Sequence, residues 1–203
     1  MRLPTEEQCF VYFDEYKVPR NIYDHCLRVK KLAVLIAEKL NHNGVNINVP
    51  LVRCGALLHD LFKVVALKDL SPNSYHSYKF SEEETEMWKK LRDKYPQMYE
   101  GEVAYIVFNK DFPELALLLK NVSDPKLDNR SWEEDIVHYA DWRTLKSDVV
   151  SVHDRLKYLQ EVYKKEAKQW ESDVMKITSF ENKIMSILNM QPEKLAELIE
   201  EKI

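Results

Sequence analysis

The stretch Cys54–Lys63, with the sequence CGALLHDLFK, constrains the fold most, because it sets a histidine beside an aspartate in an apolar helical segment. Pro50 suits the first turn of that helix, where its missing N–H would have no partner. Apolar residues then recur at the three-to-four-residue spacing of one buried face. They are Leu51, Cys54, Leu58, Leu61 and Val65. The pattern predicts a central buried helix over residues 50–67 that carries His59 and Asp60.

Burying the carboxylate of Asp60 is costly unless a partner meets its charge. A divalent cation would meet that need, since imidazole and carboxylate are both common metal ligands. The alternative is a histidine that forms a hydrogen bond in the core and an aspartate that lies at a helix end. For an isolated pair this alternative is preferred, so a metal site requires further ligands from elsewhere in the chain.

Composition indicates one helical domain. A chain of 203 residues can bury a sizeable core, and its 3 glycines argue against a turn-rich β-protein. Cys9, Cys26 and Cys54 include no CxxC pair, so we interpret them as small apolar residues in a reducing compartment. No stretch has the length of a membrane span and the N-terminus lacks a secretory apolar core, so we expect a cytoplasmic location. The net charge of −4 argues against a nucleic-acid or membrane partner.

Cap and stop signals divide the chain into helices. Capping boxes begin three of them, at Thr5–Gln8, Ser81–Glu84 and Ser131–Glu134. The predicted helices cover residues 5–17, 21–43, 50–67, 81–95, 102–108, 113–122, 131–144, 151–171, 179–190 and 192–202. The fold class is therefore all-α. We divide the chain into a main domain of residues 1–148 and a helical extension of residues 149–203, which packs on that domain or on a partner such as a second copy in a homodimer.

Two further candidate ligands lie on other predicted helices. His25 lies beside an apolar stripe and shares a face with Val29. Asp141 falls deep inside its helix, one turn after the core residue Val137. Charged residues seldom lie there unpaired.

This order of residues, a histidine, then histidine–aspartate, then a distant aspartate, all on helices, resembles the HD-domain superfamily of metal-dependent phosphohydrolases. The resemblance covers about residues 21–144. Residues 56–63, ALLHDLFK, look like the family's ALLHDxxK segment. Residues 139–143, YADWR, are similar to its YADxR segment, and residues 25–29, HCLRV, fit its HxxRV opening. An HD-domain-like helical bundle with additional C-terminal helices is therefore expected.

The resemblance implies that His25, His59, Asp60 and Asp141 hold one divalent transition metal ion. Mixed nitrogen and oxygen ligation suits manganese, iron, cobalt, nickel or zinc, so the ligands do not name the metal. Such an ion lowers the pKa of a bound water and neutralises charge that develops on a phosphoryl group. Asp60 would also orient the attacking water, which makes it a catalytic residue together with Lys63.

The expected substrate is a small phosphorylated metabolite, and family analogy alone favours a nucleotide. Lys63 and Arg28 each follow a candidate ligand by about one helical turn, so both are assigned to the substrate phosphate. His76, in the loop after the central helix, and Glu100 are further candidate substrate contacts. The simpler alternatives for these residues are a surface histidine and a solvated glutamate.

The chain also departs from parts of the superfamily. Glu100 and Asn121 stand where two-metal members carry extra histidines, which argues against a second histidine-bound ion. Residues 61–63, LFK, stand where the guanosine-tetraphosphate hydrolases have acidic residues, which disfavours that branch. The missing histidines leave a second interpretation open, a non-catalytic metal-binding or ligand-binding sensor or scaffold that retains the HD fold.

Overall fold

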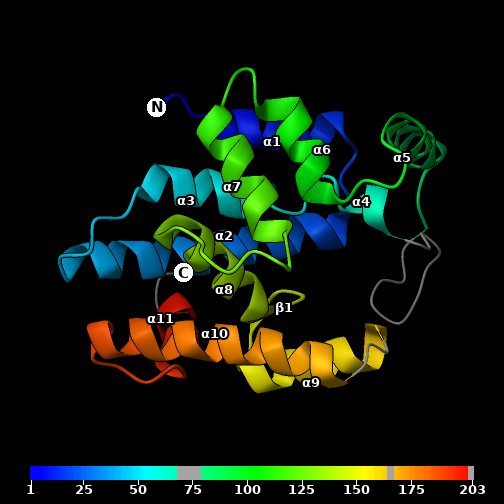
Figure 1. The fold of residues 1–203 in the computed structure, drawn as a ribbon. Helices are drawn as coiled ribbons and strands as arrows, with labels where there is room; N and C mark the ends of the chain where they lie inside the picture. Colours follow the sequence, from blue (N-terminus) through cyan, green and yellow to red (C-terminus); the bar gives the residue numbers. More distant parts are fainter. Residues whose placement is uncertain (68–78, 164–166, 201–203) are drawn as a thin grey trace.

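The computed structural model describes residues 1–67, 79–163 and 167–200, and those ranges are built almost entirely from α-helices (Figure 1). The helices are α1 (Glu6–Glu15), α2 (Arg20–His42), α3 (Val49–Leu58), α4 (Lys63–Ala66), α5 (Glu82–Lys94), α6 (Glu100–Phe108), α7 (Pro113–Ser123), α8 (Trp132–Trp142), α9 (Val152–Tyr163), α10 (Ala167–Leu188) and α11 (Lys194–Glu200). Between α8 and α9, strands β1 (Thr144–Leu145) and β2 (Asp148–Val149) form a short antiparallel hairpin that the sequence did not predict. The all-α prediction is confirmed.

Three helices begin at the predicted capping boxes. In each box the hydroxyl of the cap residue accepts a hydrogen bond from the backbone N–H three residues later, and the side chain of that later residue accepts one from the cap. Each box satisfies two N–H groups that a helix start leaves without partners. Local sequence therefore sets the first residues of α1, α5 and α8.

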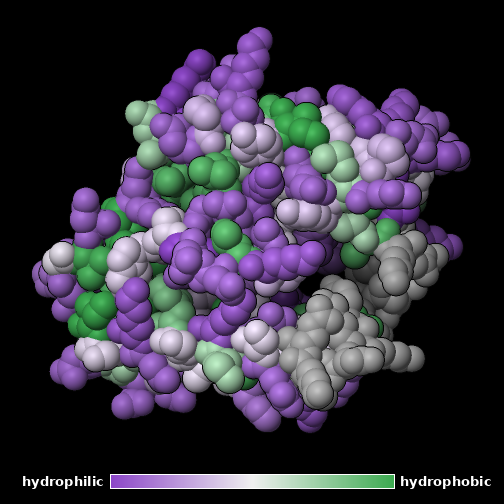
Figure 2. All heavy atoms as spheres, viewed as in Figure 1, coloured by the Kyte–Doolittle hydropathy of each residue, from purple (hydrophilic) through white to green (hydrophobic). Residues whose placement is uncertain are grey.

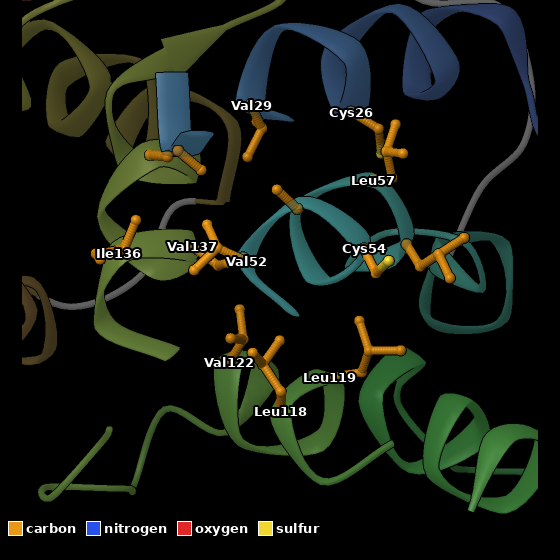
Figure 3. Packing of buried hydrophobic residues seen from close by; sticks show 14 of the residues in the cluster. Cys26, Val29, Val52, Cys54, Leu57, Leu118, Leu119, Val122, Ile136 and Val137 are labelled. Carbon is orange, nitrogen blue, oxygen red and sulfur yellow. The ribbon is translucent and has the colours of Figure 1, made fainter. Parts of the chain in front are cut away.

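Helix α3 lies at the centre of the hydrophobic core, with α2, α7 and α8 packed around it (Figure 3). Val52 and Leu57 of α3 are fully buried. Gly55 permits the close approach of α7, because a Cβ at this position would lie 2.5 Å from Leu118 Cδ2. The central position of α3 explains why its C-terminal end meets several other helices.

The central helix is shorter than the sequence predicts. It ends at Leu58 with His59 as its C-cap, and α4 follows after a tight turn. The prediction of one continuous helix over residues 50–67 is therefore wrong. The turn buries both Leu61 and Phe62, whereas adjacent residues of a continuous helix diverge by about 100°. Tertiary packing thus overrides the helical pattern at this point.

The C-terminal helices fold back on the rest of the molecule. Helices α9 and α10 lie side by side, and α10 and α11 both pack on α2 (Figure 1). The predicted single helix over residues 151–171 is wrong, and α10 continues through residues 172–178, where the sequence pattern suggested a break. That segment contains neither proline nor glycine. The buried residues Trp170, Ile177 and Ile184 recur every seven positions, so one continuous face of α10 packs on the core.

Hydrophobic residues from α1 through α11 belong to a single buried cluster. Hydrophilic residues cover most of the face shown in Figure 2, and hydrophobic ones form small separate patches there. Among the described residues, none of the helices combines the length and the apolar composition needed to cross a bilayer. Because the hydrophobic cluster includes residues of α9, α10 and α11, these C-terminal helices share one core with the helices that carry the candidate ligands.

Candidate metal centre

The four predicted ligands come from three parts of the chain. His25 lies in the second turn of α2, and Asp141 lies in the last turn of α8. His59 and Asp60 lie between them, directly after the last residue of α3. Helices α2, α3 and α8 all pack on one another, which brings the three segments together.

The side chains of these residues point toward a common position. His25 Nε2 lies 2.9 Å from Asp141 Oδ1. His59 Nε2 lies 3.7 Å from Asp60 Oδ2 and 3.9 Å from Asp141 Oδ1. One potential ligand atom from each of His25, His59 and Asp60 lies within 4.8 Å of the other two, and Asp141 adjoins this group of three through His25 and His59. Opposite ligands of an ion at about 2.1 Å are about 4.2 Å apart, so small side-chain rotations would bring these atoms around one ion.

His59 is held in an orientation that suits a metal ligand. Its Nδ1 lies 2.8 Å from the backbone oxygen of Ala56. A carbonyl oxygen can only accept, so Nδ1 donates and Nε2 is directed at the cluster. Nε2 is buried and has no hydrogen-bond partner among the described residues. A buried nitrogen without a partner is rare, and a bound cation would satisfy it.

The electrostatics of the cluster favour a bound cation. Burial alone would raise the pKa of Asp60, but Lys63 and the two histidines lower it below its usual range. The pKa of Asp141 is likewise lowered well below its usual range, because the hydrogen bond from His25 and nearby positive charge outweigh burial. Burial would lower the pKa of His59, but the charges of Asp60 and Asp141 and the neighbouring Cys26 raise it to about 9. Two ionised carboxylates therefore meet in a low-dielectric site.

Lys63 and Glu100, two of the residues predicted to contact substrate, lie beside the candidate ligands. Lys63 Nζ is 3.3 Å from Asp60 Oδ1 and 2.7 Å from Glu100 Oε1. Glu100 is the first residue of α6, and only 13% of its side chain is exposed. Asp60, Lys63 and Glu100 thus form a series of alternating charges that connects the candidate ligands with the beginning of α6.

The other residues expected to bind substrate are placed differently. Arg28 Nη1 donates to Glu200 Oε1 at 2.8 Å, so its charge is paired with α11. Asn121, which was predicted to stand in place of a histidine of the two-metal relatives rather than to contact substrate, donates through Nδ2 to Glu134 Oε1 at 2.6 Å. His76 lies outside the described residues.

Arg155 lies beside the cluster and was missed by sequence reasoning. This residue is in the first turn of α9, and its Nη2 lies 3.5 Å from Asp141 Oδ1. Only 14% of its side chain is exposed. The sequence did contain a signal, because Arg155 follows the buried Val152 by three residues and precedes Leu156. An arginine on the apolar face of an amphipathic helix needs a partner.

Comparison with protein families agrees with this geometry. Residues 22–159 match the HD domain family, so the chain belongs to that family. The matched range contains all four candidate ligands and extends into α9. HD domains generally mark metal-dependent phosphohydrolases, and the clustered histidine and aspartate side chains described above suit a divalent metal ion. No curated protein and no solved structure matches the chain.

Proposed function

We propose that the protein is a cytoplasmic metal-dependent phosphohydrolase that acts on small phosphorylated metabolites, with nucleotides as the first class to test. The observation that carries the proposal is the unpartnered, buried Nε2 of His59, which faces the oxygens of Asp60 and Asp141. Membership of the HD domain family supports the reaction class. The preference for nucleotides rests on analogy with that family.

The roles of the residues follow from their contacts. His25, His59, Asp60 and Asp141 would hold manganese, iron, cobalt, nickel or zinc, which supplies Lewis acidity toward a phosphoryl oxygen and makes water a better nucleophile near neutral pH. Asp60 orients the attacking water through its carboxylate. Lys63 keeps Asp60 ionised and brings positive charge to the side of the site that faces α6.

The test is a panel of phosphomonoesters and phosphodiesters, with nucleotides included, assayed after chelation and reloading with each of the five metals. Elemental analysis of the freshly purified protein selects the metal to try first. We expect His59→Ala to lower the rate about 1,000-fold, since metal catalysis contributes several kcal/mol to transition-state stabilisation. His153→Ala is the matched control, because His153 is exposed on α9. Circular dichroism checks that both variants fold.

The panel also separates the hydrolase from the sensor or scaffold. Turnover that His59→Ala abolishes and His153→Ala preserves supports the hydrolase. Stoichiometric metal binding with no turnover on any member of the panel contradicts it and favours a protein that keeps the fold and the ion without the reaction. Equal loss of turnover in both variants would also contradict the hydrolase assignment, because the loss would then not be specific to the candidate ligand His59.

A further inference from the structure

Among the described residues, Lys63 and Arg155 contact a candidate ligand and Arg28 follows His25 by one helical turn, and Lys63 and Arg28 are each paired with a carboxylate outside the ligand set. Lys63 Nζ contacts Glu100 Oε1 at 2.7 Å. Arg28 Nη1 contacts Glu200 Oε1 at 2.8 Å. The charge of each is therefore balanced whether or not an ion is bound.

Arg155 differs from these two cations. Its carboxylate contact in the described part of the chain is with Asp141, itself a candidate ligand, and the 3.5 Å separation is long for a charge-assisted hydrogen bond. Its Nε is buried and has no hydrogen-bond partner among the described residues. Its guanidinium carbon lies 5.3 Å from the centroid of the Tyr158 ring, and this contact supports the guanidinium plane beside the cluster.

A buried guanidinium with an unused donor is costly unless a ligand completes its hydrogen bonds. A divalent cation held by Asp141 would meet the charge of that carboxylate, which leaves the charge of Arg155 without a balancing anion. The planar fork of an arginine matches the oxygens of a phosphate group.

We propose that Arg155 binds a phosphate oxygen of the substrate, so that helix α9 completes the site formed by α2, α3 and α8. This inference rests on the proposed phosphohydrolase function. It assigns the principal substrate anchor to a residue of the C-terminal extension rather than to Arg28 or Lys63. The ligand it requires is an anionic phosphate group next to the metal position.

The experiment measures the binding of inorganic phosphate to the full chain loaded with Mn²⁺, by isothermal titration calorimetry. We expect Arg155→Gln to weaken phosphate binding about 10- to 100-fold, which is the typical effect of losing a hydrogen bond to a charged group. Arg155→Lys keeps the charge but loses the fork, so we expect an intermediate loss. Lys157→Gln is the matched control, since it removes a charge from an exposed position of α9 and should change phosphate affinity less than about twofold.

A second measurement separates substrate binding from a structural role. Mn²⁺ affinity, followed by the electron paramagnetic resonance signal of the free ion, should be unchanged or tighter in Arg155→Gln, because the variant removes a positive charge next to Asp141. Weaker Mn²⁺ binding in parallel with weaker phosphate binding would overturn the proposal. So would a wild-type phosphate affinity in Arg155→Gln, an equal loss in Lys157→Gln, or a loaded wild-type protein that binds no phosphate.

Failure of this inference differs from failure of the proposed function. Phosphate binding requires no turnover, so a loaded protein that hydrolyses nothing can still show the dependence on Arg155. The opposite outcome is a protein whose turnover needs His59 but whose phosphate affinity and KM are unchanged in Arg155→Gln. That result would leave the hydrolase assignment intact and exclude Arg155 as the phosphate anchor.

Discussion

Two polar clusters lie at the C-terminal end of α8, one around Asp141 in its last turn and one around its C-cap residue Arg143, and they are built in opposite ways. Around Arg143, every guanidinium nitrogen has a partner. Nε donates to the Val150 carbonyl at 2.5 Å, and Nη1 donates to Glu181 Oε2 at 2.6 Å and to the Tyr139 hydroxyl at 2.5 Å. Nη2 donates to the Pro192 carbonyl at 3.1 Å.

In the cluster around Asp141, by contrast, one buried nitrogen lacks a hydrogen-bond partner among the described residues. That nitrogen is His59 Nε2, and two carboxylates share the site. A buried polar cluster whose members are all satisfied contributes order to the fold, whereas an unsatisfied one indicates a missing ligand. The difference indicates that Arg143 stabilises the fold, and it supports the metal-binding role proposed for Asp141.

The largest expected effect tests the Arg143 cluster. Arg143→Ala should lower the free energy of unfolding by about 3–5 kcal/mol, because it leaves the carboxylate of Glu181 buried without its charge partner. Urea denaturation followed by circular dichroism measures the change. Arg20→Ala is the control, since Arg20 forms an exposed ion pair with Asp24 and should change stability by less than about 0.5 kcal/mol. Similar small effects in both variants would refute the structural assignment.

The next largest expected effect is the stabilisation of the fold by a metal ion that binds at the Asp141 cluster. Mn²⁺ at 100 times its dissociation constant should raise the free energy of unfolding by about 2.7 kcal/mol. For a chain of this length each kcal/mol corresponds to a rise of about 2–4 °C in Tm. Thermal unfolding with and without the ion measures the shift, which His59→Ala should abolish. A full shift in that variant would mean that the ion binds elsewhere.

The candidate ligands could be predicted because each stands out locally. His25, His59 and Asp141 are polar residues on or beside apolar helix faces, and Asp60 adjoins one of them. Capping boxes likewise depend on residues three apart, so helix starts are readable from short segments. Local patterns therefore were enough for the fold class, whereas the resemblance to the HD-domain superfamily joined the four candidate ligands into one set.

What the sequence did not reveal depends on contacts between distant segments. Arg28 pairs with Glu200, 172 residues later, and no local pattern connects the two. The break after α3 arises because the core takes both Leu61 and Phe62. Arg155 approaches Asp141 because the hairpin of β1 and β2 turns the chain back, so that the first turn of α9 lies near the last turn of α8.

Helix α8 also carries Asp135, a partly buried carboxylate that belongs to neither cluster. Burial raises the pKa of Asp135 to about 6, although Arg130 and Lys183 oppose the shift. A raised carboxyl pKa stabilises the fold below the unfolded pKa of about 3.9, and that contribution is lost as the pH rises through 6.

Asp135→Asn, which stays neutral, should therefore be more stable than the wild type at pH 8 and gain nothing at pH 4. Because Asp135 is only partly buried, we expect a gain of about 1 kcal/mol rather than the full value of the shift. Urea unfolding at both pH values measures it, with the exposed Asp93→Asn as the control. A gain of equal size at both pH values would mean that the Asp135 side chain acts through packing rather than through its charge.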